Sequence, residues 1–189
     1  MATSAPPPRP KREDVAPSAA AVGAFLASVV GAEVPHGALA FGKFDEHALA
    51  GLTLVSTDAA AGKVVARLPL GDSKLNRFRT LHGGCTATLI DVVGTCAVIL
   101  ESGAGGVSQS LSVDYLAPVA GLKAPADGGA AGATTPFVYV TATALKVGRS
   151  IAVVEVRLHR ADGVLAAIGR LVKHVAATPR VATPAPKEP

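Results

Sequence analysis

The sequence has little of several features that mark specialised classes of protein. It contains no tryptophan, one methionine and only 4% aromatic residues among its 189 residues. Two cysteines cannot build a disulfide scaffold, and the glycines and prolines follow no collagen-like period. No apolar run reaches ~18 residues without a charge or a break, so no membrane span is expected. With 49% hydrophobic residues, the chain is also too apolar to be disordered throughout.

The charge of the chain indicates little about its binding partners. The formal net charge is +4, but no block of Lys and Arg interleaved with aromatic residues is present, so no nucleic acid partner is expected. The mild positive bias suits a phosphorylated small molecule. His36, His47 and His159 share no ligand spacing with a cysteine or a carboxylate. We therefore expect no metal and no other cofactor.

The amino end and the cysteines bear on location. Residues 1–17 carry acids as well as bases and precede the first apolar stretch, which is unlike a secretory signal or a mitochondrial presequence. Cys85 and Cys96 would lie ~16 Å apart on one helix, beyond the ~7 Å limit between Cα atoms for a disulfide. They are interpreted as two small core residues in a reducing compartment. The expected location is the cytoplasm, with the mitochondrion as the alternative.

Composition divides the chain into one domain and two ends. Residues 1–17 and 178–189 hold nine of the 14 prolines and are predicted to be a disordered N-terminal arm and a disordered C-terminal tail. Residues 18–177 are long enough for one domain. Within it, residues 121–136 are low in large apolar side chains and predict a flexible insertion.

Two segments of the domain predict helices. Residues 19–31 are apolar and Ala-rich, and Ser18 before them is a candidate N-cap. Residues 83–101 are apolar nearly all round, with Asp91 as their only internal charge, which predicts a long helix that other elements wrap.

The remaining segments predict antiparallel strands. The segment 107–117 alternates strictly, which predicts that Ser108 faces the side opposite to Leu111 and Tyr115. Runs of strands around an isolated helix indicate an α+β protein, with a curved antiparallel sheet wrapped around the central helix. The predicted strands are 52–57, 63–70, 107–117, 137–147, 150–160 and 164–175.

Two features of the central helix point to chemistry. Burying an unpaired carboxylate costs several kcal/mol, so a helix whose only interior charge is Asp91 usually has a use for it. The alternative is a structural aspartate bonded to a neighbouring amide or hydroxyl. Gly83 and Gly84 open the helix, where free backbone N–H groups can receive an oxygen that becomes an oxyanion. The alternative is that these glycines allow close packing against a strand.

Helix geometry relates these two features. Gly83 and Asp91 would lie ~12 Å apart along one helix and be turned by ~80°. One carbonyl cannot contact both groups, because a general base must lie within ~3 Å of its proton or act through one water. If both serve one reaction, Asp91 must come from an antiparallel second copy of the helix, at a two-fold dimer interface.

The segments LNRFRTLHGGCTATLIDVVGTCAVILESGAGGVSQSLSVDYLAPV and GRLVKH resemble the hotdog-fold acyl-CoA thioesterases of the phenylacetate-degradation type. Within that family the sequence is most similar to the eukaryotic acyl-CoA thioesterase 13 group, also called thioesterase superfamily member 2. The resemblance extends from about Phe44 to Val175. It implies a hotdog fold assembled as a dimer of dimers, a homotetramer.

The resemblance also implies residue roles. Asn76 and the Gly83 N–H would hold and polarise the thioester carbonyl, Asp91 of the partner subunit would deprotonate water, and Ser108 would help hold that water. His82 would shape the start of the helix. Further substrate-binding candidates are Gly84 beside the carbonyl, Arg77 and Arg79 toward the nucleotide phosphates, and the terminal pair Lys173 and His174, either at the CoA phosphates or on a solvated edge.

The resulting hypothesis is hydrolysis of acyl-CoA to a free fatty or aryl acid and CoA. One alternative is a non-catalytic acyl-CoA-binding or regulatory hotdog module, although such a module would need no buried base. A hotdog dehydratase or hydratase is a third interpretation. It is disfavoured because His82 and Asp91, nine positions apart, would lie ~180° apart around one helix.

Overall fold

The structure is a computed structural model, and it describes residues 18–30, 44–121 and 136–175 of the chain. The predicted N-terminal arm and C-terminal tail, and residues 122–135 of the predicted insertion, lie outside the described residues. The elements are, in order, α1 (Ala19–Val30), α2 (Phe44–Ala48), β1 (Thr53–Asp58), β2 (Lys63–Pro69), the 3-10 helix η2 (Asp72–Lys74), α3 (Gly83–Ser102), β3 (Val107–Tyr115), β4 (Phe137–Val147), β5 (Ile151–Arg160) and β6 (Leu165–His174).

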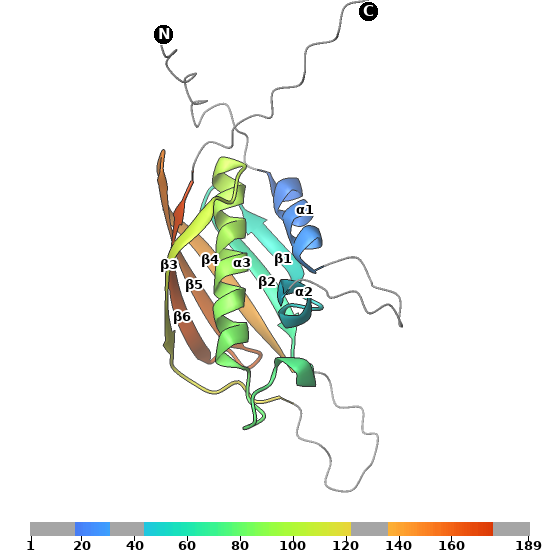
Figure 1. Ribbon diagram of the computed structural model, residues 1–189. Helices are drawn as coiled ribbons and strands as arrows, with labels where there is room; N and C mark the ends of the chain where they lie inside the picture. The colour runs from blue at the N-terminus through green and yellow to red at the C-terminus, as the bar shows by residue number, and fades with distance from the viewer. Residues whose placement is uncertain (1–17, 31–43, 122–135, 176–189) are drawn as a thin grey trace, which may run out of the picture.

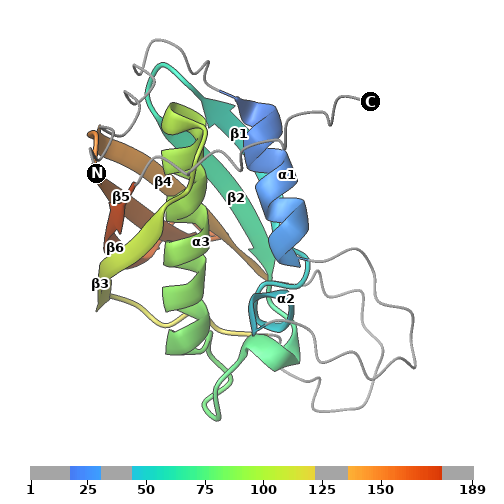
Figure 2. The ribbon, with the colours of Figure 1, turned by 45° about the horizontal axis from the view of Figure 1, so that its top comes forward.

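The strands form one antiparallel sheet in the order β1-β2-β4-β5-β6-β3. The sheet curves around α3, which lies along its concave side, and α1 lies beside α3 (Figure 1). The turned view shows the same arrangement, with β3 at one edge and α1 over β1 and β2 (Figure 2). The predicted α+β architecture, a curved antiparallel sheet around one long helix, is confirmed.

Strand periodicity explains the core between α3 and the sheet. Alternate residues point to the same side of a strand, and on the side toward α3 they are small or branched apolar residues. From α3, thirteen of the twenty residues are buried. The buried residues of the four inner strands are Val64, Ala66, Leu68, Val138, Val140, Ala142, Val147, Ala152, Val154, Val156, Leu158, Ala166, Ala167, Gly169, Leu171 and Lys173.

The helix and the sheet approach closely at two glycines. A Cβ on Gly94 of α3 would lie 2.7 Å from Leu171 Cδ2, and a Cβ on Gly169 of β6 would lie 2.5 Å from Ile90 Cγ2. Cβ atoms essentially never lie within 3.0 Å of such atoms, so a larger residue at either glycine would have to displace the Leu171 or Ile90 side chain or the backbone that carries it. These two glycines therefore set the depth at which α3 sits against the sheet.

The helix at the amino end of the domain agrees with its prediction. Ser18 Oγ accepts a hydrogen bond from the Ala21 N–H at 3.1 Å and caps α1. The five-residue α2 and the three-residue η2 were not predicted, because elements this short carry no readable periodicity.

Both cysteines are free and buried on α3, as predicted. Burial raises the pKa of Cys85 to about 11 and that of Cys96 to about 12. Both thiols are therefore protonated, poor nucleophiles near neutral pH.

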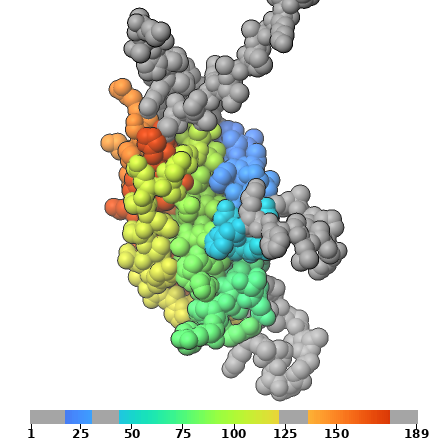
Figure 3. Space-filling model, in the orientation of Figure 1, coloured from blue at the N-terminus to red at the C-terminus, as the bar shows by residue number. Residues whose placement is uncertain are grey.

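Among the described residues, α3 is the one helix long and apolar enough to cross a membrane by length and composition, with a mean hydropathy of 1.7. Most of it, 72% of the apolar stretch, is buried inside the molecule, which is typical of a core helix. The rest reaches the surface between β3 and α1 (Figure 3). The elements that the sequence predicts to surround this helix therefore leave one side of it uncovered.

Candidate functional site

The amino terminus of α3 carries an unpaired backbone donor. His82 is the N-cap residue, and its Nδ1 accepts a hydrogen bond from the Gly84 N–H at 2.9 Å. The Gly83 N–H has no acceptor in the part of the chain that the structure describes. It lies at the positive end of the helix dipole, so it can stabilise an oxygen that gains negative charge.

Asn76, in the loop before α3, has one amide proton left to donate. Its Oδ1 accepts hydrogen bonds from the Phe78 N–H at 2.9 Å and the Thr80 N–H at 3.2 Å. Its Nδ2 donates to Thr80 Oγ1 at 2.9 Å. Because a side-chain amide nitrogen carries two protons, the second remains available to a ligand. The three bonds hold this side chain in place before any ligand arrives.

The Gly83 N–H and the Asn76 amide both border a cavity of about 580 Å³. Tyr115 from β3 borders it and donates its hydroxyl proton to the Gly83 carbonyl at 2.9 Å, which ties the edge of the sheet to the start of the helix. The cavity is lined by Asn76, Thr80, Leu81, Gly83, Gly84, Thr86, Tyr115, Leu116, Ala117, Pro118, Val119, Leu158, Ala166 and Ala167.

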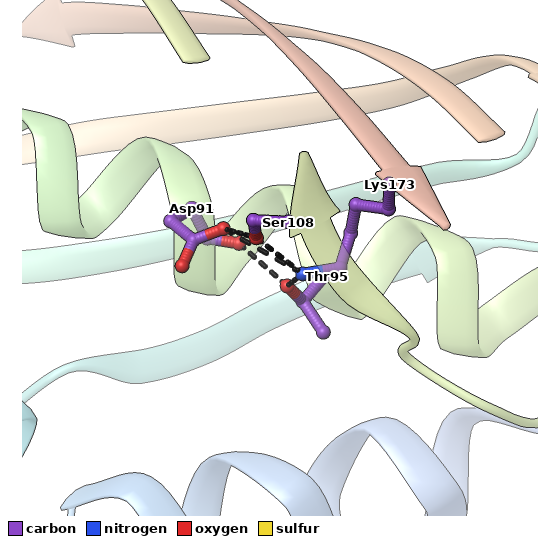
Figure 4. Close-up of polar contacts among 4 residues, drawn as sticks. All are labelled: Asp91, Thr95, Ser108 and Lys173. Atoms are coloured by element: carbon purple, nitrogen blue, oxygen red, sulfur yellow. Dashed lines mark hydrogen bonds and ion pairs between the residues drawn. The ribbon is translucent and has the colours of Figure 1, made fainter. Parts of the chain in front are cut away.

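Asp91 belongs to a second cluster, two turns further along α3 (Figure 4). Its Oδ1 accepts a hydrogen bond from Ser108 Oγ at 2.5 Å and lies 3.6 Å from the Lys173 ammonium. Lys173 Nζ donates to Ser108 Oγ at 2.8 Å and to Thr95 Oγ1 at 2.7 Å. Thr95 Oγ1 in turn donates to the Asp91 backbone carbonyl at 2.7 Å. Four side chains from α3, β3 and β6 thus form one network.

The network is buried at one end and open at the other. The Lys173 side chain is 4% exposed, whereas that of Asp91 is 42% exposed. The prediction that Asp91 is a buried, unpaired carboxylate is wrong within one chain, because its side chain is partly exposed and pairs with Lys173. Burial lowers the pKa of Lys173 from its ordinary value, and the Asp91 carboxylate acts in the opposite direction.

The two clusters are separate within one chain. Asp91 does not line the cavity that Asn76 and Gly83 share. Residues 83 and 91 of one straight helix are eight positions apart, which is about 12 Å. One chain therefore presents a carbonyl-binding group and a base-bearing group that cannot meet at one atom.

A β-bulge brings Ser108 to the helix side of the sheet. In the β3–β6 pair, Ser108 lies opposite Lys173, but the register shifts before Ser110, and Leu111 lies opposite Leu171. Directly opposed residues share a face, so Ser108 and Leu111 both face α3. The strict alternation expected for this strand is therefore wrong: the bulge at Gln109 adds one residue and moves Ser108 to the side of Asp91.

The other candidate substrate-binding residues occupy two places. Arg77 and Arg79 lie in the loop before α3, where the Arg77 guanidinium covers the Phe78 ring and Arg79 pairs with Asp72 at 3.0 Å. His174 is half-buried and follows Lys173 on β6, so its side chain points to the opposite face of the sheet.

Three residues of these clusters were missed by the sequence reasoning. Thr80 and Tyr115 contact Asn76 and Gly83, and Thr95 joins Asp91 to Lys173. Only Thr95 had a local signal, since it stands four residues after Asp91 and so on the same helix face. No group of three or more His, Cys, Asp or Glu that could hold a metal occurs among residues 18–30, 44–121 and 136–175.

Comparison with known proteins gives a consistent family. The sequence pattern of the Thioesterase superfamily matches residues 78–121. Human acyl-coenzyme A thioesterase 13 is 38% identical over 132 residues, which cover 69% of this chain and 84% of that protein.

Solved structures agree. Thioesterase superfamily member 2 from zebrafish has a TM-score of 0.64 and 29% identity, and the alignment covers 82% of this chain and 96% of that one. A hypothetical thioesterase protein from Streptococcus pneumoniae, solved with coenzyme A, has a TM-score of 0.55 at 21% identity. The alignment covers 67% of this chain and 87% of that one, and the likeness is one of fold alone. The sheet and helix described above are thus the hotdog fold.

Proposed function

The chain belongs to the thioesterase superfamily, and on that premise we propose that it hydrolyses acyl-CoA thioesters to a free fatty or aryl acid and CoA. The observation that carries the proposal is the cavity at the start of α3, which the Gly83 and Asn76 donors both line. The names of relatives such as human acyl-coenzyme A thioesterase 13 support acyl-CoA as the substrate class.

The proposed reaction uses the two clusters together. The thioester carbonyl oxygen accepts from the free Gly83 N–H and from the second amide proton of Asn76. Asp91 takes a proton from water, and the water oxygen bonds to the carbonyl carbon. The resulting oxyanion is held by the same two donors, which act most strongly when charge has formed. Collapse of this intermediate breaks the carbon–sulfur bond, and the CoA sulfur leaves with the proton that Asp91 took from the water, which restores the Asp91 carboxylate.

Because one chain separates these clusters by about 12 Å, we propose that each site takes Asn76 and Gly83 from one subunit and Asp91 and Ser108 from the other. The free edge of β3 supports such a dimer. Val107 and Tyr115 on this edge strand are 71% and 57% exposed, an unusual exposure for large apolar side chains. Two such dimers would form the homotetramer.

The CoA moiety would lie outside the cavity, against basic side chains. Arg77 and Arg79 stand on the loop that also carries Asn76, so they are placed to attract the nucleotide phosphates. His174, opposite Val107, lies at the other end of α3 from this loop within one chain, so we propose that it assists at the phosphates bound to the other subunit. Lys173 is buried beside Asp91, so it stands away from the phosphates.

Release of free CoA from a panel of acyl-CoAs tests the proposal and separates it from a binding-only module. A binding-only module would bind acyl-CoA and release no CoA. Asp91→Asn keeps the size of the side chain but removes the base, so turnover should fall roughly 10²–10⁴-fold while binding persists.

Asp114→Asn is the matched control for this variant. Asp114 of β3 lies opposite Ile168 of β6, and its side chain is on the face away from α3. Its variant should retain normal turnover. A folded Asp91→Asn protein with turnover close to wild type would contradict the role of Asp91.

A further inference from the structure

A buried lysine beside a candidate base requires an explanation that the proposed function does not supply. Lys173 is 3% exposed, and its stem packs inside the sheet–helix core. Keeping an ammonium there is costly unless its protons find acceptors. Its acceptors are two hydroxyls, Ser108 Oγ and Thr95 Oγ1, and the carboxylate of Asp91 lies 3.6 Å away.

The chemistry of these groups fixes the direction of every hydrogen bond. A lysine ammonium donates three protons and accepts none, so both hydroxyl oxygens accept from Lys173. Each hydroxyl has a single proton of its own to donate. That of Ser108 goes to Asp91 Oδ1, at a distance typical of a charge-assisted bond, and that of Thr95 goes to the Asp91 backbone carbonyl. Lys173 therefore directs two hydroxyl protons onto one residue.

This arrangement leaves one carboxylate oxygen of Asp91 unused. Oδ1 is occupied by Ser108 and faces Lys173, whereas Oδ2 has no hydrogen-bond partner among the described residues. The Asp91 side chain is 42% exposed, so Oδ2 is accessible to water. Oδ2 is thus the oxygen that can take a proton from water.

We propose that Lys173 is a positioning residue of the hydrolytic site: it orients the Ser108 hydroxyl toward Asp91 Oδ1 and so presents Oδ2 to the attacking water. The proposal rests on the proposed function, since it assigns Lys173 to the base of that reaction. It differs from a contact with CoA phosphates, which would require the ammonium at the surface.

The first measurement needs no turnover and no lysine variant. In ¹⁵N-labelled wild-type protein, the Lys173 ammonium, assigned through its side-chain carbons, should give an Nζ–H resonance whose protons exchange slowly with water. The resonance should shift or broaden in Ser108→Ala. It should not change in Ser110→Ala, whose hydroxyl lies beyond the bulge on the other face of β3. Fast exchange in the wild type, or no response to Ser108→Ala, would overturn the proposal.

The second measurement separates positioning from phosphate binding. Lys173→Met keeps the length and apolar stem of the side chain but donates no proton. We expect kcat to fall roughly 10–100-fold with KM within about twofold. The loss should be equal for an acyl-CoA and for the same acyl group on N-acetylcysteamine, which has no phosphates. Lys146→Met, at an exposed lysine of β4, is the control and should behave as wild type. A rise in KM confined to the acyl-CoA would instead assign Lys173 to the phosphates.

A double-variant comparison tests whether Lys173 acts through Ser108. If it does, adding Lys173→Met to Ser108→Ala should reduce kcat by no more than about threefold further, because the interaction is already lost. Independent effects that multiply would overturn the proposal. If the wild type releases no CoA from any acyl-CoA, the proposed function fails, and the ammonium resonance still decides the contacts of Lys173. The same resonance decides the proposal if Lys173→Met does not fold.

Discussion

The proposed shared site predicts that two inactive variants restore activity when mixed. Asp91→Asn removes the base, and Asn76→Asp removes the amide donor from the carbonyl site. Asn76→Asp is preferable to alanine because a carboxylate oxygen can still accept from the Phe78 and Thr80 N–H groups that shape the loop. Both substitutions are close to isosteric, so each should fold and assemble normally.

The size of the recovery follows from the geometry. If each site combines Asn76 of one subunit with Asp91 of the other, a mixed dimer has one site with both native residues and one with both substitutions. Random exchange of equal amounts puts about half of the subunit pairs in mixed dimers, so about a quarter of all sites become intact. Activity should therefore rise from the background of either variant to about a quarter of the wild-type value.

The assay is CoA release after exchange of subunits, with native mass spectrometry to count mixed dimers. Each variant incubated alone is the control. If mixed dimers form and activity stays at the level of the separate variants, both residues act within one chain, and the separation of about 12 Å along α3 has been misinterpreted.

Two further predictions concern stability. Gly169→Ala places a Cβ 2.5 Å from Ile90 Cγ2, which should lower the free energy of unfolding by about 1–3 kcal/mol and Tm by several degrees. Ile90→Val in the same chain should restore part of the loss, and Gly71→Ala is the neutral control because nothing lies within 4 Å of its Cβ. An unchanged Tm in Gly169→Ala would contradict the close approach of α3 and β6. Removal of residues 1–17 and 178–189 should leave Tm and CoA release almost unchanged, because segments so rich in proline bury little apolar surface. A large fall in Tm would show that these segments pack on the domain.

The main elements could be predicted because their signals are local. Helix α3 follows from an apolar run between a Gly-Gly start and a Gly-rich end, and its αL residue Gly103 closes it with an N–H bond to the Ile99 carbonyl. Strand β4 begins and ends at the predicted residues, 137 and 147, because Pro136 and Gly148 bound it, although its register shifts between Ala144 and Lys146. The residue types of the candidate site could be chosen for the same reason, since Asp91 is a lone charge in an apolar helix.

By itself, the sequence determined α1, α3 and the six strands, the α+β class and the separation of Gly83 from Asp91, all of which depend on the period and rise of one helix or strand. Only the tertiary structure decided which side chains meet. Ser108 reaches Asp91 because a single extra residue at Gln109 reverses the facing of the strand, which strict alternation cannot anticipate. Lys173 meets Thr95 across 78 positions because the last strand, β6, packs against α3. Contacts between distant segments depend on how the elements pack, and no local pattern encodes that.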